Sequence, residues 1–135
     1  MIILDASAWA TSLSDTGLMG VTCRDAMVKD RRWTAPSHAA TETLRTIRRY
    51  ELAGLVSADS ASAMVAQVAS APVRYMGPSR SLLAGQWALR HNFSAYDAAY
   101  VVLARQFQAP LLTTDGRLAR AATAFGVEVQ LVQRD

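Results

Sequence analysis

The sequence contains little cysteine, histidine and lysine. Its 135 residues include one cysteine, Cys23, and two histidines, His38 and His91, which stand far apart along the chain. A single thiol cannot form an intramolecular disulfide, and these three residues cannot complete a thiolate and imidazole set for zinc. The composition therefore excludes a disulfide scaffold and a zinc site of that kind, and we expect the protein in a reducing cytoplasm.

Long hydrophobic runs are also missing. The longest apolar stretch, residues 98–104, is far shorter than the roughly 18 residues that indicate a membrane span. The first five residues, MIILD, have no basic region before the apolar ones, so they do not resemble a signal peptide. We expect them to form the first strand of a protein that does not contact a membrane.

Proline and glycine are sparse, with 4 and 7 residues, and no Pro- or Ser-rich linker, repeat or low-complexity segment divides the chain. Hydrophobic residues make up 51% of the sequence. A chain of this length buries roughly two-thirds of its unfolded surface, so it needs no metal merely to fold. The sequence predicts one domain, residues 1–135.

Short apolar stretches alternate with helical patterns. The strands are predicted at 1–4, 33–36, 73–76, 110–114 and 127–132. A helix follows Asp5, and further helices are predicted at 20–30, 38–53 with Ser37 as N-cap and Gly54 at the end, 57–70, 79–91, 96–108 and 117–125. Such alternation predicts an α/β fold with a central, mainly parallel sheet of four to five strands and helices on both faces.

Four carboxylates have positions that favour a shared site. Asp5 and Asp115 each follow an apolar strand directly, at the edge of a parallel sheet where ligands bind. Asp97 begins the helix before the second of these strands, and Glu42 lies early in the helix after Pro36. Taken singly, the three aspartates also fit helix caps, and Glu42 fits a solvated ion pair with Arg45.

Taken together, the segments around these acids resemble the PIN-domain ribonucleases, and most of all their VapC-type toxin branch. The resemblance spans essentially the whole chain. It is carried by Asp5-Ala-Ser7, by Glu42 with Arg45 and Arg48 in a helix between Pro36 and Gly54, by Ser94-Ala-Tyr-Asp97-Ala-Ala-Tyr100, and by Leu112-Thr113-Thr114-Asp115. The fold that this resemblance implies is a three-layer α/β/α sandwich.

The resemblance also implies an activity, namely endoribonuclease cleavage that depends on Mg²⁺ or Mn²⁺. Asp5, Asp97 and Asp115 would hold the metal, and Glu42 would complete the catalytic set by orienting a water or a second ion. The hydroxyls of Ser7 and Thr113 would line the pocket; that makes six implied site residues. Independently of the family, hard divalent cations take oxygen ligands, so clustered carboxylates suit them.

The charge balance supports a nucleic acid substrate. The formal net charge is +3, the sequence pI is about 9.5, and the 14 basic residues comprise 13 arginines and Lys29. If the four acids share a pocket, only seven acidic residues remain elsewhere to oppose the basic ones. The main candidates for contact with RNA phosphates are Arg45, Arg48, Arg49 and Arg117.

The three tryptophans are candidates for stacking on unpaired bases, although tryptophan is more often a core residue. Trp9 follows Asp5 and Ser7 closely, so it is the one expected nearest the pocket. In the helix 96–108, Tyr96 and Tyr100 recur on one face with Leu103 and Phe107, and we expect this stripe to be core.

Partners and alternatives complete the interpretation. The resemblance implies a cognate VapB-type antitoxin that blocks the acidic pocket, and a toxin homodimer. A haloacid-dehalogenase-like phosphatase is disfavoured because Ser7 stands where a second aspartate is needed, and a receiver domain because Lys29 is the only lysine. The remaining alternative is a non-catalytic RNA- or protein-binding PIN-like module, which would show no metal-linked rise in melting temperature.

Overall fold

A computed structural model describes residues 1–134; Asp135, the last residue of the expected domain, lies outside the described part. Its parallel sheet has the strand order β3-β2-β1-β4-β5. The strands are β1 (Ile2–Leu4), β2 (Trp33–Pro36), β3 (Arg74–Met76), β4 (Leu111–Thr113) and β5 (Val129–Leu131). The helices are α1 (Ala6–Ser14), α2 (Leu18–Lys29), α3 (Ala39–Leu52), α4 (Ala58–Ser70), α5 (Arg80–Ala88), α6 (Ala95–Phe107) and α7 (Gly116–Ala124).

The two central positions of the sheet belong to strands that are apolar and buried along their whole length. Every residue of β1 and of β4 is buried, whereas the edge strands β3 and β5 consist of exposed and half-buried residues. Strands covered on both faces need continuous hydrophobic sequence, which β1 and β4 supply. The predicted parallel α/β fold is therefore confirmed.

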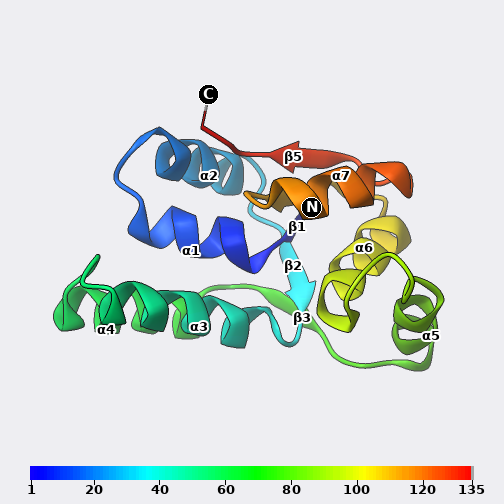
Figure 1. Ribbon diagram of the computed structural model, residues 1–135, viewed down its shortest axis with the longest axis horizontal. Helices are drawn as coiled ribbons and strands as arrows, with labels where there is room; N and C mark the ends of the chain where they lie inside the picture. The colour runs from blue at the N-terminus through cyan, green and yellow to red at the C-terminus, as the bar shows by residue number, and fades with distance from the viewer. Residues whose placement is uncertain (135) are drawn as a thin grey trace.

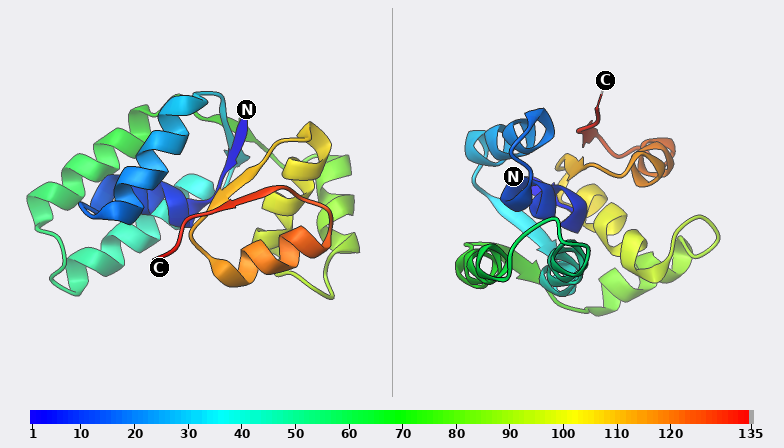
Figure 2. Two further views of the ribbon diagram at one scale, coloured as in Figure 1. Left: turned by 90° about the horizontal axis from the view of Figure 1, so that it is seen from above. Right: turned by 60° about the vertical axis from the view of Figure 1, so that its left-hand side comes forward.

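Helices cover both faces of the sheet, giving the expected three layers (Figure 1). In this view α1 and α3 lie to one side of β1 and β2, and α5 and α6 lie to the other. The second set of views shows α3 and α4 packed side by side, far from α5 (Figure 2). Because all five strands point the same way, every strand's carboxyl end reaches the same edge of the sheet.

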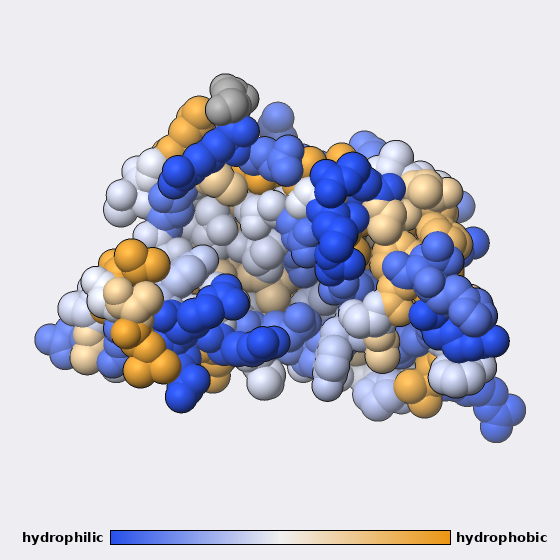
Figure 3. All heavy atoms as spheres, in the orientation of Figure 1, coloured by the Kyte–Doolittle hydropathy of each residue, from blue (hydrophilic) through white to orange (hydrophobic). Residues whose placement is uncertain are grey.

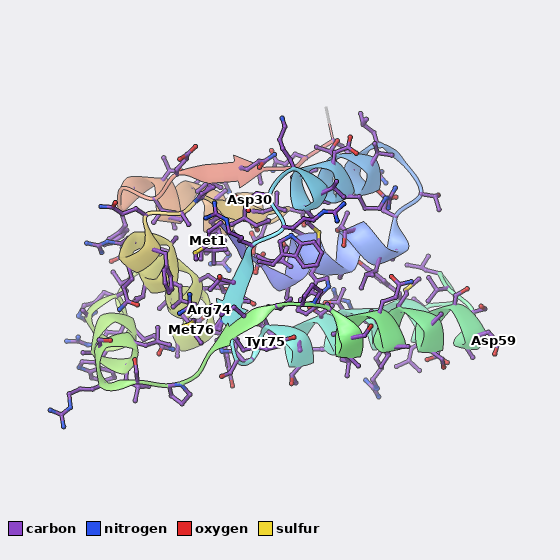
Figure 4. The ribbon with its side chains drawn as sticks, turned by 180° about the vertical axis from the view of Figure 1, so that it is seen from behind. Met1, Asp30, Asp59, Arg74, Tyr75 and Met76 are labelled. Atoms are coloured by element: carbon purple, nitrogen blue, oxygen red, sulfur yellow. The ribbon has the colours of Figure 1, made fainter. Side chains whose placement is uncertain are left out.

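The start of β1 is fixed by its own terminus. The N-terminal ammonium of Met1 pairs with Asp30, and the backbone N–H of Ile2 donates to the carbonyl of Arg32 at 3.0 Å. Figure 4 shows Met1 and Asp30 from behind, close to the start of β2. These contacts set β1 alongside β2 and so determine where Asp5 leaves the sheet.

Most helix ends follow the predicted signals. Ser57 and Ser94 are N-caps whose hydroxyls accept from backbone N–H groups, and Gly54 adopts a φ of +74° just beyond α3. Two predictions were wrong in detail. The N-cap of α3 is His38 rather than Ser37, and α5 ends at Ala88 instead of extending to His91.

The central helix α6 is buried along a continuous run, Ala98–Ala104. Tyr100 and Leu103 are core residues as predicted, but Tyr96 is 62% exposed, so that part of the predicted core stripe is wrong. The first residues of α6 lie outside that buried run: Ala95 and Tyr96 are exposed and Asp97 is half-buried. Close approach to α5 depends on Gly85, where an added Cβ would lie 2.9 Å from Val102.

Within residues 1–134, none of the helices has the length and apolar character needed to cross a membrane.

Candidate active site

The carboxyl ends of β1 and β4 meet the N-terminal ends of α3, α6 and α7 at one edge of the sheet. Asp5 follows β1, Asp115 follows β4, Glu42 lies in the first turn of α3 and Asp97 in the first turn of α6. Seen from the front, hydrophilic residues gather over α3 and α7 on either side of a hollow (Figure 3). The expected convergence of acids from distant parts of the sequence is thus present in the structure.

Asp5 is the buried member of this group, with 6% of its surface exposed. Its pKa is raised from 3.8 to about 6, chiefly because burial disfavours the charged form; hydrogen bonds from Ser7 and Thr113 oppose this rise, and the charges of Glu42 and Asp97 add to it. Asp5 occupies the N-cap position of α1, but its side chain makes no capping hydrogen bond. The capping alternative therefore does not account for its carboxylate.

Two hydroxyl groups hold Asp5 in place. Ser7 donates to Oδ2 of Asp5, and Thr113 donates to the same oxygen at 2.7 Å. The hydroxyl of Thr113 also accepts from the backbone N–H of Asp115 at 3.0 Å, and that of Ser7 accepts from Thr114 at 3.0 Å. These bonds join the ends of β1 and β4 around one carboxylate oxygen.

Glu42 is half-buried and is held by an element other than its own helix. Tyr100, fully buried in α6, donates its hydroxyl to Oε1 of Glu42 at 2.8 Å. Nε2 of His38 lies 3.3 Å from the same oxygen. Burial raises the pKa of Glu42, and the Tyr100 hydrogen bond partly offsets that rise. A solvated ion pair with Arg45 is therefore not the environment of this carboxylate.

Asp97 and Asp115 share a cation, Arg117. Arg117 donates to Oδ2 of Asp97 at 2.9 Å, and the same nitrogen lies 3.8 Å from Oδ2 of Asp115. The other oxygen of Asp115 caps α7 by accepting from the backbone N–H groups of Arg117 and Leu118 at 3.0 and 3.1 Å. For Asp115 the capping interpretation is correct, and one oxygen still faces the site.

The donor set fits a hard divalent cation that retains part of its water shell. Among residues 1–134, no three carboxylate, histidine or cysteine side chains are close enough together to hold a metal ion as they stand. Mg²⁺ commonly uses only one or two carboxylates and keeps several waters. Both hydroxyls bond to Oδ2 of Asp5, and within the described chain its Oδ1 has no such partner and is left for a cation.

The predicted RNA-contact residues are all exposed: Arg45, Arg48 and Arg49 on α3, and Arg117 on α7. Arg117 lies at the acids, whereas Arg48 lines a groove between α3 and α4. The tryptophans are placed differently from the expectation. Trp9 is 2% exposed and belongs to the core, while the indole N–H of Trp33 donates to the backbone carbonyl of Met27 at 2.8 Å. Only Trp87 is open to solvent, at 69% exposure, with Arg90 over its ring.

His38 and Tyr100 are the two site residues that the sequence interpretation missed. His38 precedes Glu42 by four residues on α3, and Tyr100 follows Asp97 by three residues on α6. Both spacings place side chains on one helix face, so each signal was present in the sequence. The helical stripe predicts Tyr100 as a core residue, and Tyr100 is indeed buried. Its hydrogen bond to Glu42 is the part that the stripe does not predict.

Comparison with known families gives one match that covers most of the chain. The profile described as "PIN domain" matches residues 2–124. Among curated proteins, Ribonuclease VapC1 of Mycobacterium tuberculosis is 33% identical over 131 residues, covering 97% of each chain. Ribonuclease VapC3 of the same organism is 36% identical over 120 residues, covering 89% of this chain and 86% of the relative.

Solved structures with similar folds include VapC20 of Mycobacterium tuberculosis, described as a Sarcin-Ricin loop cleaving toxin. It superposes with a TM-score of 0.67 at 21% identity, over 90% of this chain and 95% of the other. FitAcB from Neisseria gonorrhoeae gives a TM-score of 0.69 at 15% identity, over 96% of each chain. At these identities the likeness supports the fold.

Proposed function

The chain belongs to the PIN-domain family, among relatives named VapC ribonucleases, and we propose that it is a toxin that cleaves RNA internally with the help of Mg²⁺ or Mn²⁺. The observation that supports this most strongly is the convergence of Asp5, Glu42 and Asp97. Their charges act on one another across a chain separation of 92 residues from first to last, and the pKa of Asp5 is raised to about 6. Burial raises the pKa of Asp5 and of Glu42, and like charges held together out of water are costly unless they bind a cation or a proton.

Asp5, Asp97 and Asp115 are the proposed metal-holding residues. Oδ1 of Asp5 and Oδ2 of Asp115 accept no hydrogen bond that holds the fold together. Oδ2 of Asp97 is bound by the exposed side chain of Arg117. A bound Mg²⁺ would supply Lewis-acid chemistry, polarising a phosphoryl oxygen and activating a water.

The remaining side chains have positioning roles in this proposal. Glu42, which accepts a hydrogen bond from Tyr100 and has a raised pKa, would orient the attacking water and accept its proton. Ser7 and Thr113 keep Oδ2 of Asp5 occupied, so that its other oxygen would be the one that binds the metal. Attack on the RNA phosphodiester forms one P–O bond and breaks another, with no covalent enzyme intermediate.

The basic surface and the partners follow from the same proposal. Exposed Arg45, Arg48 and Arg49 on α3 would contact phosphates of the RNA strand, as would Arg117 once it leaves Asp97. We further propose a homodimer, in the cytoplasm, and neutralisation by a cognate VapB-type antitoxin that covers the acids. That a PIN-fold neighbour is a named toxin is consistent with this interpretation.

The test is cleavage of total RNA by the purified, partner-free protein in Mg²⁺, Mn²⁺ or EDTA, beside Asp97→Asn. We expect discrete fragments that require the metal and disappear in the variant. The folding control is an unchanged far-ultraviolet circular dichroism spectrum for Asp97→Asn. No cleavage by folded wild type in either metal, or equal cleavage by the variant, would contradict the proposal.

A further inference from the structure

Next to the acids, on the same edge of the sheet, lies a second feature that the proposed reaction does not use. It is a cavity of about 170 Å³ at the carboxyl ends of β2 and β3, closed on its far side by α5. Its lining includes Ser37, His38, Met76, Leu83 and Gln86. The volume is below the roughly 300 Å³ of sites that bury drug-sized ligands, so it suits one small planar group.

His38 is the wall between this cavity and the acids. Its ring lines the cavity, and its Nε2 is buried 3.3 Å from Oε1 of Glu42 without a well-aligned hydrogen bond. On its other sides the imidazole packs edge-on against Tyr96 and Tyr100, with ring centroids 5.1 and 5.6 Å apart. A group entering the cavity would therefore lie one ring away from the proposed catalytic carboxylate.

Tyr96 adds an exposed aromatic ring beside His38, which lines the cavity. It directly precedes Asp97, contacts His38, and leaves 62% of its surface in solvent. A large aromatic side chain this exposed contributes little to the core. Held against His38, the ring has little conformational freedom left to lose when a flat partner stacks on it.

Polar groups at the cavity complete the match to a base. The carboxamide nitrogen of Gln86 donates to the carbonyl of Ala95 at 2.8 Å, which fixes the side chain and leaves its oxygen as an acceptor. The hydroxyl of Ser37 stands at the exposed rim. Bases offer flat faces for stacking and polar edges for hydrogen bonds, and they are accessible in this way only in unpaired RNA.

From these observations, and resting on the proposed ribonuclease function, we propose that His38, Tyr96 and the adjoining cavity form a subsite for one unpaired nucleobase next to the scissile phosphate. The base would stack on Tyr96 and direct its edge toward Ser37 and Gln86. A base held in a duplex is already stacked and paired, so the subsite would take a base only from an unpaired part of the RNA.

The test measures binding without catalysis, in EDTA, by fluorescence anisotropy of a labelled single-stranded RNA and of the same sequence as a duplex. Tyr96→Ala should weaken binding of the single strand about ten- to a hundredfold, the loss expected for one stacked base, whereas Tyr96→Phe should bind as wild type does. Binding of the duplex should not distinguish the three proteins.

Tyr75→Ala is the matched control. Tyr75 is 40% exposed on β3 and immediately precedes Met76, which lines the cavity, but strand alternation sends its side chain to the other face. Figure 4 shows both residues on the edge strand. We expect this variant to bind RNA as wild type does, and equal weakening by Tyr75→Ala and Tyr96→Ala would overturn the subsite.

A second readout reports stacking directly. With 2-aminopurine placed at successive positions of the single strand, wild type should quench its fluorescence at one position, and Tyr96→Ala should abolish that quenching. Absence of position-dependent quenching in wild type would overturn the proposal. It would also be overturned if Tyr96→Ala bound and quenched the RNA as wild type does and lost only binding to a protein partner. Wild type that binds and quenches yet cuts no RNA with metal would contradict the proposed function and leave the subsite standing.

Discussion

Asp5 and Asp115 occupy equivalent positions between a strand and a helix, but their carboxylates have different environments and partners. Each directly follows a central parallel strand and directly precedes a helix. Asp5 is buried, makes no capping hydrogen bond and has a pKa raised to about 6. Asp115 caps α7 with one oxygen and lies near an arginine with the other. The same local sequence signal therefore specifies a helix cap in one case and a destabilised charge in the other.

The contrast extends to the whole site. Asp5 and Glu42 accept hydrogen bonds from the hydroxyls of Ser7, Thr113 and Tyr100, which are neutral donors. Asp97 and Asp115 lie instead beside Arg117, a cation of the chain itself. Neutral donors orient a carboxylate without cancelling its charge, so Asp5 can offer its full charge to a metal ion, whereas Asp97 and Asp115 must first give up their contact with Arg117.

The largest expected effect comes from Asp5→Asn, which removes the buried charge and keeps its shape. Cleavage should fall by about 10²–10⁴-fold. Folding raises the pKa of Asp5 from 3.8 to about 6, so the folded protein binds more protons between these values and its free energy of unfolding falls as the pH rises through this window. In EDTA at pH 8 the free energy of unfolding of the variant should therefore exceed that of wild type, by on the order of 3 kcal/mol at most, and the variant should melt at a higher temperature. Below pH 4 the two proteins should be nearly equal in stability.

Asp115→Asn makes the same change at the open carboxylate and serves as the control. It should lose cleavage activity without any gain in melting temperature at pH 8, because its charge is partly solvated and asparagine is an equally good N-cap. A stability gain of similar size in Asp5→Asn and Asp115→Asn would contradict the proposed difference between these two carboxylates.

Tyr100→Phe tests whether a neutral donor orients the catalytic carboxylate. The variant lacks the hydroxyl that donates to Glu42 at 2.8 Å. We expect kcat to fall about 10- to 100-fold with KM unchanged, as for the loss of an outer-shell partner in other metal sites. Because this hydrogen bond lowers the pKa of Glu42, its removal should also move the acidic limb of the pH–rate profile upward. Tyr75→Phe is the control, and an unchanged kcat and profile for Tyr100→Phe would assign Tyr100 to the core alone.

Arg117→Gln removes the cation that lies beside Asp97 and Asp115. Arg117 and a metal ion compete for Asp97 and Asp115, so the variant should bind Mn²⁺ two- to fivefold more tightly, the range expected for one exposed ion pair. Isothermal titration calorimetry on the RNA-free protein measures this effect. Arg120→Gln, an exposed change on the same helix, should leave Mn²⁺ affinity unaltered, and weaker Mn²⁺ binding by Arg117→Gln would contradict the competition.

The elements that the sequence predicted well are those with local causes. Apolar runs marked all five strands, and Ser57, Ser94 and Gly54 marked helix ends, because capping depends on neighbours in the chain. Tyr96 was misplaced for the opposite reason. Helical periodicity puts it with Tyr100, but periodicity carries no information on where the sheet beneath the helix stops.

The same limit applied at the site. Trp9 is close to Ser7 in sequence, yet residues two apart on a helix point to different sides, and tertiary packing sent Trp9 into the core. Sequence spacing pairs Glu42 with Arg45 on its own helix. Its actual partner, Tyr100, lies 58 positions away on α6, and no pattern within α3 indicates that contact.

The smallest expected effect separates the two roles of Asp115. Its Oδ1 accepts from two backbone N–H groups of α7, whereas its Oδ2 faces Arg117 and the site. Asp115→Asn should retain the cap and unfold within a few tenths of a kcal/mol of wild type, while Asp115→Ala should lose about 1 kcal/mol of unfolding free energy. Chemical denaturation in EDTA measures the difference, with Ser57→Ala as the control for a cap remote from the acids. If cleavage fails equally in both Asp115 variants while only alanine destabilises the fold, the charge serves the reaction and the oxygen geometry serves the helix; equal stability of the two variants would show that the cap contributes nothing measurable here.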